Sequence, residues 1–213
     1  MKLYTYFRSS ASYRVRIALA YKGIAHEAAY VSLVKAEHQG DAFRGVNAQG
    51  LVPALEDGGQ VLIQSLAIIE YLDERHPAPP LLPKDPVERA YVRAVSQIVA
   101  CEMHPLNNLR TLKYIRKAYK LDEEGVNTWY RHWIADGFGM LEGYLGRERR
   151  VGTYCDGDAV SMADCCLVPQ VFNAQRYNCE LAPYPMIMRI FDACMQLDAF
   201  AATQPMKQAD ATA

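Results

Sequence analysis

The chain has 213 residues, of which 51% are hydrophobic and 22% charged, a composition typical of a folded globular protein with one or two domains. Its 23 Lys and Arg residues nearly balance 24 Asp and Glu residues, and the net charge of -1 argues against nucleic acid or an anionic membrane surface as a partner. Uncharged stretches such as residues 61–69 are far shorter than the ~20 apolar residues that cross a bilayer. The N-terminal MKLYTYF lacks the features of a signal peptide, so we expect a cytoplasmic protein.

Strand and helix signals alternate at the start of the chain. A Tyr- and Phe-rich strand is predicted at residues 2–7, followed by hydroxyl residues at 9–12 and a helix that stops at Gly23. A second strand is predicted at residues 26–33. This order forms a βαβ unit with two parallel strands, which favours an α/β domain.

A hairpin and a helix are predicted next. Apolar runs at residues 51–55 and 61–63 flank the turn signal Asp57-Gly58-Gly59, which indicates two antiparallel strands. Ser65 then precedes an apolar helical pattern, and its hydroxyl is expected to serve as the N-cap.

Prolines mark a domain boundary after this helix. Residues 76–80 contain three prolines and cannot form a helix or a central strand. We therefore predict a first domain at residues 1–80 and an all-helical domain at residues 88–213, where helix formers dominate. Within it, Ser161 and Asp164 have the spacing of a capping box, which we interpret as structural.

Six cysteines lack a C-x-x-C pair and the Cys and His spacing of a zinc site, so no metal centre is expected. In a reducing compartment they are expected to act as small hydrophobic side chains, not as nucleophiles. They are Cys101, Cys155, Cys165, Cys166, Cys179 and Cys194.

Polar residues at strand ends and helix starts indicate a site for a small anion. Arg8 and the hydroxyls of residues 9–12 could hold a thiolate, because donors aimed at sulfur lower the pKa of a thiol. If the Val52-Pro53 bond is cis, the Val52 backbone groups are free to pair with a peptide, and Gln64-Ser65 could bind a carboxylate. A ligand that fits all three positions needs a thiolate, a peptide backbone and a carboxylate, which describes glutathione. A serine run and an X-Pro bond each also have a plain structural explanation, as a helix cap and a turn.

Longer motifs resemble one known family. Residues 9–19, SSASYRVRIAL, are similar to the SSCSWRVRIAL signature of zeta-class glutathione transferases. The same family is resembled at residues 64–72, at Val52-Pro53, at residues 163–164 with 167–170, and at residues 182–185, so the likeness spans nearly the whole chain. The family includes maleylacetoacetate isomerase and bacterial maleylpyruvate isomerases.

The resemblance implies a thioredoxin-like first domain, a helical second domain, and a cytosolic homodimer that uses glutathione as its cofactor. It carries Ser9 over as the hydroxyl that holds the glutathione sulfur, with Ser10 beside it. The positions that it places around glutathione are Ser9, Ser10, Ala11, His38, Val52, Gln64, Ser65 and Asn108. Many family members have Cys at the position of Ala11. Any role of that Cys in those proteins therefore does not carry over to this chain.

The substrate implied by the resemblance is a maleyl diacid. Arg8, Arg110 and Arg176 match its carboxylate-binding arginines, a residue type suited to bidentate contacts, although each alone could be a solvated surface charge. The sequence His104-Pro-x-Asn-Asn resembles maleylpyruvate isomerases, whereas maleylacetoacetate isomerases often have Gln at that position. We therefore take Ser9, Ser10 and His104 as the candidate catalytic residues.

The activity implied is glutathione-dependent cis-trans isomerisation in aromatic catabolism. A thiolate adds to the carbon–carbon double bond, which leaves a single bond that can rotate. The thiolate is then expelled and the double bond forms again. Two alternatives stay open. One is a glutathione transferase or α-haloacid dehalogenase that uses the same thiolate, and the other is a glutathione-binding module without turnover.

Overall fold

The computed structural model describes residues 1–212 of the chain. It divides into two units, of which the first contains Met1–Leu82 together with the chain from Met195 onward, and the second contains Pro83–Cys194. The described helices include none long and apolar enough to cross a membrane.

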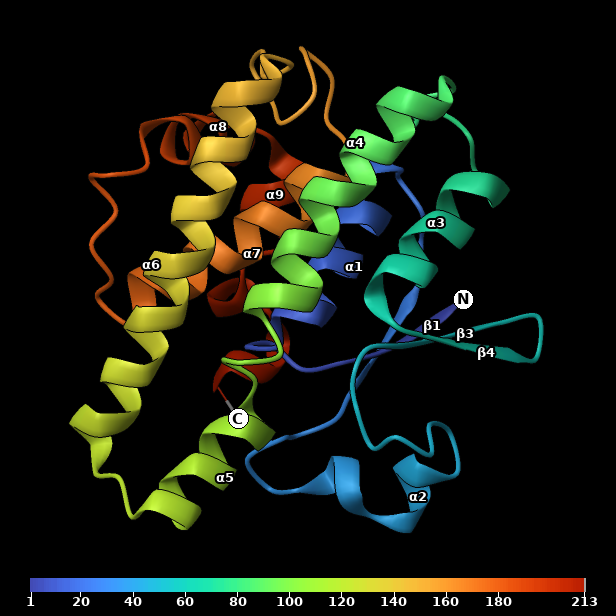
Figure 1. The fold of residues 1–213 in the computed structure, drawn as a ribbon. Helices are drawn as coiled ribbons and strands as arrows, with labels where there is room; N and C mark the ends of the chain where they lie inside the picture. Colours follow the sequence, from blue (N-terminus) through green and yellow to red (C-terminus); the bar gives the residue numbers. More distant parts are fainter. Residues whose placement is uncertain (213) are drawn as a thin grey trace. The chain divides into compact units, whose positions relative to one another are not determined.

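The first unit is built on a four-stranded sheet with the order β2-β1-β3-β4 (Figure 1). Strand β1 pairs in parallel with β2 and antiparallel with β3, and β3 forms an antiparallel hairpin with β4. The strands are β1 (Lys2–Thr5), β2 (Glu27–Tyr30), β3 (Ala54–Asp57) and β4 (Gln60–Ile63). The predicted βαβ unit and hairpin are confirmed. Strands β1 and β2 are shorter than expected, whereas β3 begins later than the predicted run and β4 matches it to within one residue.

Helices cover both faces of this sheet. Helices α1 (Ser10–Tyr21) and α3 (Ser65–Arg75) contact each other, and Figure 1 shows them on the opposite side of the strands from α2 (Asp41–Arg44). On the α2 side, the rings of Tyr4 and Phe43 lie 5.9 Å apart. The unit therefore has the layered α/β architecture that the sequence predicts.

Helix α1 ends at the glycine that the sequence singles out. Gly23 has a φ of +65°, and its N–H donates to the carbonyl of Ala20 while the N–H of Ile24 donates to that of Leu19. This pair of hydrogen bonds is a Schellman motif, which requires a left-handed residue after the helix and favours glycine there.

The C-terminal segment packs in the first unit, whereas the sequence assigns it to the helical domain. The Tyr13 hydroxyl donates to the carbonyl of Phe200, and the buried Arg16 guanidinium donates to that of Thr203. The Phe7 N–H donates to the Asp210 carboxylate at 2.9 Å. The segment contains α9 (Asp198–Ala201), η3 (Pro205–Lys207) and η4 (Ala209–Thr212). Its helical composition gave no signal of this long-range packing.

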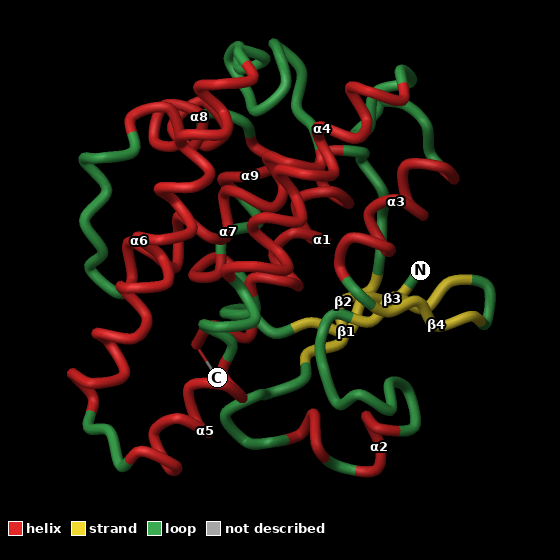
Figure 2. The backbone as a smooth tube through the Cα atoms, in the orientation of Figure 1, coloured by secondary structure: helices red, strands yellow, loops and turns green. Residues whose placement is uncertain are grey.

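The second unit is entirely helical among its regular elements (Figure 2). They are α4 (Pro86–Gln97), the π-helical turn η2 (Ile98–Met103), α5 (Leu109–Tyr119), α6 (Glu123–Glu148), α7 (Met162–Arg176) and α8 (Pro185–Met195). Helix α7 is the centre of the unit, because it contacts α4 and η2 and is buried along most of its length. The predicted fold class, α/β followed by all-α, is confirmed.

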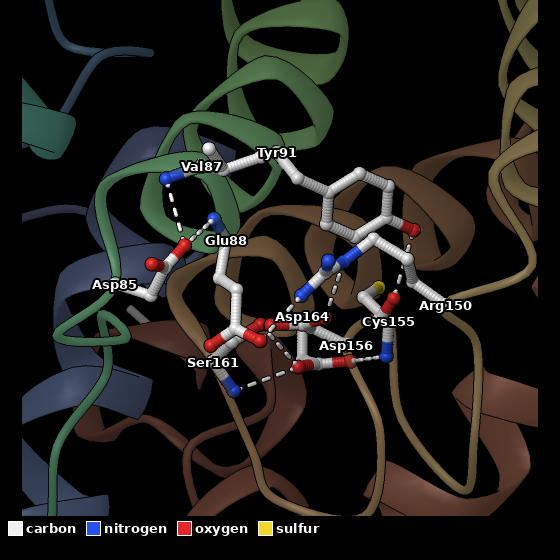
Figure 3. A network of polar contacts seen from close by, with 9 residues as sticks. All are labelled: Asp85, Val87, Glu88, Tyr91, Arg150, Cys155, Asp156, Ser161 and Asp164. Carbon is white, nitrogen blue, oxygen red and sulfur yellow. Dashed lines mark hydrogen bonds and ion pairs between the residues drawn. The ribbon is translucent and has the colours of Figure 1, made fainter.

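The start of α7 has the predicted capping box (Figure 3). The fully buried Asp164 carboxylate accepts from the N–H and the hydroxyl of Ser161, each at 2.8 Å, and from the N–H of Cys155 at 2.8 Å. Burial raises the pKa of Asp164, and these donors oppose that rise. The motif is therefore structural, as predicted, and it also fixes the loop before α7.

A second set of contacts in Figure 3 joins that loop to α4. The Arg150 guanidinium pairs with Asp156 at 3.0 Å and with Glu88 of α4 at 3.3 Å. The Tyr91 hydroxyl donates to the carbonyl of Cys155 at 3.0 Å. The loop that contains Cys155 is thus held from both α4 and α7.

Four of the six cysteines are buried, which agrees with their interpretation as small hydrophobic side chains. Cys101 is exposed and Cys179 is half-buried, so the interpretation does not extend to them. Among the described residues, no group of three His, Cys, Asp or Glu side chains is arranged to hold a metal ion.

Candidate functional site

The first candidate group lies at the N-terminus of α1. Ser9 is the N-cap, with φ of −72° and ψ of 114°, and its Oγ accepts from the N–H of Ser12 at 3.2 Å. Because that bond uses an oxygen lone pair, the Ser9 hydroxyl hydrogen remains available for donation. Ser10 is buried as the first residue of the helix, and Ala11 is half-buried. The positive end of the helix dipole thus carries a half-buried hydroxyl donor.

Arg8 directly precedes this group and is exposed. Its guanidinium lies 4.8 Å from the centroid of the Phe7 ring and 3.4 Å from the Tyr6 hydroxyl. The side chain is therefore oriented by two aromatic residues of the same segment.

The second candidate group lies at the N-terminus of α3. Gln64 is the N-cap residue, with a φ of +71°, and its amide donates to the side chain of Gln49 at 3.1 Å. Ser65 is the first helical residue, so the prediction that it caps the helix is wrong. Its hydroxyl instead accepts from Arg14, a fully buried residue of α1, at 3.2 Å. A buried guanidinium needs acceptors, and this demand decides the orientation of Ser65.

Arg14 is a residue of this group that the sequence analysis missed. It lies on α1 and ties that helix to the first turn of α3, so Ser9 and Ser65 belong to two helices joined by a buried hydrogen bond. The signal was an arginine within the apolar run of residues 13–19, a position where a charge is buried only with a partner.

A loop beside the sheet carries two further candidates. The Val52–Pro53 peptide bond is cis, and neither backbone polar group of Val52 has a hydrogen-bond partner within residues 1–212. His38, which is half-buried, lies in η1 (Glu37–Gln39). At Gly50, with φ of +62°, a Cβ would approach the His38 carbonyl to 2.8 Å, so only glycine lets η1 pack against this loop.

In the second unit, three candidates follow the π-helical turn η2. Asn108 is the N-cap of α5, and its Oδ1 accepts from the N–H of Arg110 at 3.0 Å. Its Nδ2 lies 3.5 Å from Nε2 of the half-buried His104. The Arg110 side chain is exposed in the first turn of α5. His104, Asn108 and Arg110 are thus placed together by a helix end and a cap, and π-helical turns of this kind are frequent at functional sites.

Arg176 is the last residue of α7 and is exposed. Its guanidinium lies 4.7 Å from the centroid of the Tyr177 ring, and Tyr177 stacks on Tyr130 of α6. Neither tyrosine was predictable from the sequence, because nothing in the local pattern relates residues so far apart in the chain.

The strand order of the first unit and the helical second unit together define the architecture of the glutathione transferases. The family model of the glutathione S-transferase N-terminal domain matches residues 3–80. A maleylpyruvate isomerase from a Ralstonia species is 49% identical over 210 residues, which cover 99% of each chain.

Two solved structures are similar to this chain over nearly its whole length. The holo structure of a maleylpyruvate isomerase, described as a bacterial zeta-class glutathione S-transferase, has a TM-score of 0.96 and 49% identity, with 99% of both chains covered. A maleylacetoacetate isomerase from Methylobacterium extorquens AM1, with malonate and GSH bound, has a TM-score of 0.96 and 40% identity, with 100% of both chains covered. The chain belongs to the zeta-class glutathione transferase family.

Proposed function

We propose that this protein is a glutathione-dependent cis-trans isomerase that converts a maleyl diacid, maleylpyruvate or maleylacetoacetate, to its fumaryl isomer. The observation that carries the proposal is the Ser9 hydroxyl, which is held at the N-terminus of α1 by its bond from the Ser12 N–H and keeps its own hydrogen for donation. Relatives similar over the whole chain are named as isomerases of these two diacids, which supports the choice of reaction.

The residues of the first unit fit glutathione. A tripeptide presents a thiol, backbone amides and carboxylates, and each has a chemical counterpart here. Ser9 and Ser10 offer hydroxyls at a helix N-terminus, and the unpartnered backbone groups of Val52 match a peptide. Gln64 and Ser65 stand at the N-terminus of α3, where amide N–H groups favour a carboxylate. We assign His38 and Ala11 to the surroundings of the same ligand, and Asn108 in the second unit to its binding.

Bound glutathione would supply a thiolate that adds reversibly to the double bond, so that the bond between the two carbons can rotate. The part of Ser9 is to donate its hydroxyl hydrogen to the anionic sulfur, which lowers the pKa of the thiol. The N–H groups of the first turn of α1 add to this stabilisation through the helix dipole.

The diacid carries two negative charges, and we assign Arg8, Arg110 and Arg176 to its carboxylates. All three side chains are exposed, and a guanidinium can donate two parallel hydrogen bonds to one carboxylate. We assign His104, whose ring lies beside the Asn108 amide, to binding or proton transfer at the conjugated carbonyl, where negative charge develops.

We further propose that the protein acts in the cytoplasm as a homodimer in aromatic catabolism. The proposal is supported by its family membership. Sedimentation equilibrium at micromolar concentration tests the dimer directly, and a mass near 24.0 kDa would contradict it.

The experiment that tests the function compares maleylpyruvate and maleylacetoacetate side by side at equal concentration, with and without glutathione. We expect conversion only with glutathione, and faster turnover of maleylpyruvate because of His104. Faster turnover of maleylacetoacetate would contradict that preference but not the reaction. Conversion of neither diacid, together with halide release from an α-haloacid, would replace the isomerase with a dehalogenase. Binding of glutathione without any turnover would indicate a non-catalytic module.

A further inference from the structure

An aromatic stack in the second unit contacts one of the proposed substrate arginines. The rings of Tyr130 and Tyr177 are almost parallel, with centroids 3.6 Å apart and an interplanar angle of 10°. The guanidinium carbon of Arg176 lies 4.7 Å from the centroid of the Tyr177 ring, within the range of a cation–π contact.

Both tyrosines are fixed by other parts of the unit. Tyr130 is 2% exposed on α6, and burial raises its pKa, so the ring stays neutral. The backbone carbonyl of Tyr177 accepts from Nε of Arg131 at 3.0 Å, and its N–H donates to the carbonyl of Asn173 at 3.1 Å. The stack therefore combines a fully buried ring, Tyr130, with a half-buried ring, Tyr177, whose backbone is held at both its carbonyl and its N–H.

The Arg176 guanidinium depends on this support. Within residues 1–212 it makes no hydrogen bond and no ion pair, and it lies against the Tyr177 ring. A guanidinium that rests on an aromatic ring can keep its N–H groups directed outward for a carboxylate, and it loses less freedom when the carboxylate binds.

The same stack is joined to the segment that carries His104 and Asn108. Nδ2 of the buried Asn107 donates to the backbone carbonyl of Tyr130 at 3.2 Å. Asn107 directly precedes Asn108, whose amide lies beside the ring of His104. Tyr130 thus contacts both the support of Arg176 and the segment of the other candidate residues.

We infer that Tyr177, backed by Tyr130, is a positioning residue that holds Arg176 for one carboxylate of the diacid. The inference rests on the proposed function, because it takes Arg176 as a ligand of the substrate. On this inference the stack helps the protein to select dicarboxylates over monocarboxylates. A stack that only stabilised the fold would have no such effect on selectivity.

The test replaces Tyr177 and measures kcat and KM for the diacid. We expect Tyr177→Leu to raise KM on the order of fivefold with little change in kcat, and Tyr177→Phe, which keeps the ring, to behave like the wild type. Tyr119→Leu, at an exposed tyrosine of α5, is the matched control and should leave both parameters unchanged. If Tyr177→Leu does not fold, Tyr177→Met offers a flexible side chain of similar reach.

Two readouts separate positioning from mere stability. The ratio of the inhibition constants of malonate and acetate should move toward unity in Tyr177→Leu, because the second carboxylate loses its prepared partner. In an Arg176→Ala background, Tyr177→Leu should have no further effect on KM. Equal effects of Tyr177→Leu with and without Arg176, or an unchanged inhibitor ratio, would overturn the inference while wild-type turnover leaves the proposed function standing. Absence of turnover in the wild type would instead overturn the proposed function.

Discussion

A candidate residue of the first unit, Ser9, and one of the second unit, Arg176, are held in different ways. Ser9 is the N-cap of α1, so local backbone geometry places it. In the second unit, Arg176 at the end of α7 is oriented by Tyr177, which itself stacks on Tyr130 of α6. The placement of Ser9 depends on a short segment of the chain, whereas that of Arg176 depends on packing between distant segments.

This difference predicts how each kind of residue responds to substitution. A residue placed by a helix terminus changes the chemistry of its own site when it is replaced, with a modest effect on stability. A residue placed by packing is sensitive to changes elsewhere in its unit.

The largest expected effect is on the packing of the second unit. Asp164→Ala leaves the buried N–H groups of Ser161 and Cys155 without their acceptor, and we expect a loss of about 3–5 kcal/mol in the free energy of unfolding. Urea denaturation followed by circular dichroism measures it. Asp158→Ala is the matched control, because this exposed carboxylate also accepts two bonds from one residue, Thr153, and its loss should be much smaller. Equal losses of unfolding free energy in the two variants would mean that burial of the Asp164 carboxylate does not contribute to its effect on stability.

The next effect is on chemistry in the first unit. Ser9→Ala removes the proposed donor to the sulfur, and we expect kcat/KM to fall about 100-fold. Because a thiolate without this donor is less stable, the pKa of the bound thiol rises and the pH profile of kcat/KM moves to higher pH. Ser9→Thr keeps the hydroxyl and should retain most of the activity.

The loss of a helix cap must be separated from this effect. Asp122→Ala removes the N-cap of α6, whose carboxylate accepts from the N–H of Gly125 at 2.8 Å. It should lower stability by about 1 kcal/mol, as Ser9→Ala does, without a change in activity. Full activity of Ser9→Ala would remove the central assumption of the proposed mechanism.

A smaller effect is expected at the start of α3. Ser65→Ala removes a proposed contact to glutathione and an acceptor of the buried Arg14, so KM for glutathione should rise about tenfold with kcat nearly unchanged. Ser96→Ala, at a buried serine that donates to the carbonyl of Val92 within α4, is the control. A KM for glutathione that is the same in both variants would exclude Ser65 from the site.

The smallest expected effect is a difference in labelling rate among the six cysteines, all of which lie in the second unit. In the folded protein, N-ethylmaleimide should label the exposed Cys101 first. Burial raises the pKa of Cys179 to about 11, so its labelling should be slow at neutral pH and increase about tenfold per pH unit below that value. Mass spectrometry identifies the labelled sites.

The four buried thiols report on the second unit alone, because the first unit lacks cysteine. Their labelling in low urea therefore measures opening of the second unit. Rapid labelling of these thiols without urea would contradict their burial.

Several features of the fold follow from local sequence signals. Gly23 terminates α1 because a Schellman motif needs a left-handed residue, and the glycines after Asp57 turn the β3–β4 hairpin. The spacing of Ser161 and Asp164 is sufficient to predict the capping box. These features were predictable because each involves residues a few positions apart whose backbone conformation depends on their own chemistry.

The family motifs were also predictable from the sequence, and with them the fold and the cofactor. The run at residues 9–19 begins at the N-cap of α1 and the motif at 64–72 begins at the N-cap of α3, and each extends over most of its helix. Sequence alone therefore determined the α/β and all-α organisation, the zeta-class family and the use of glutathione.

Only the tertiary structure decided which side chains support the candidate residues. The hydroxyl of Ser65 accepts from Arg14 instead of capping its helix, because a buried guanidinium must find an acceptor. The C-terminal segment packs on α1 through Tyr13 and Arg16, and Tyr177 stacks on Tyr130. Such contacts join residues tens to hundreds of positions apart, and no periodicity or local propensity encodes them, since they arise when the chain closes its core.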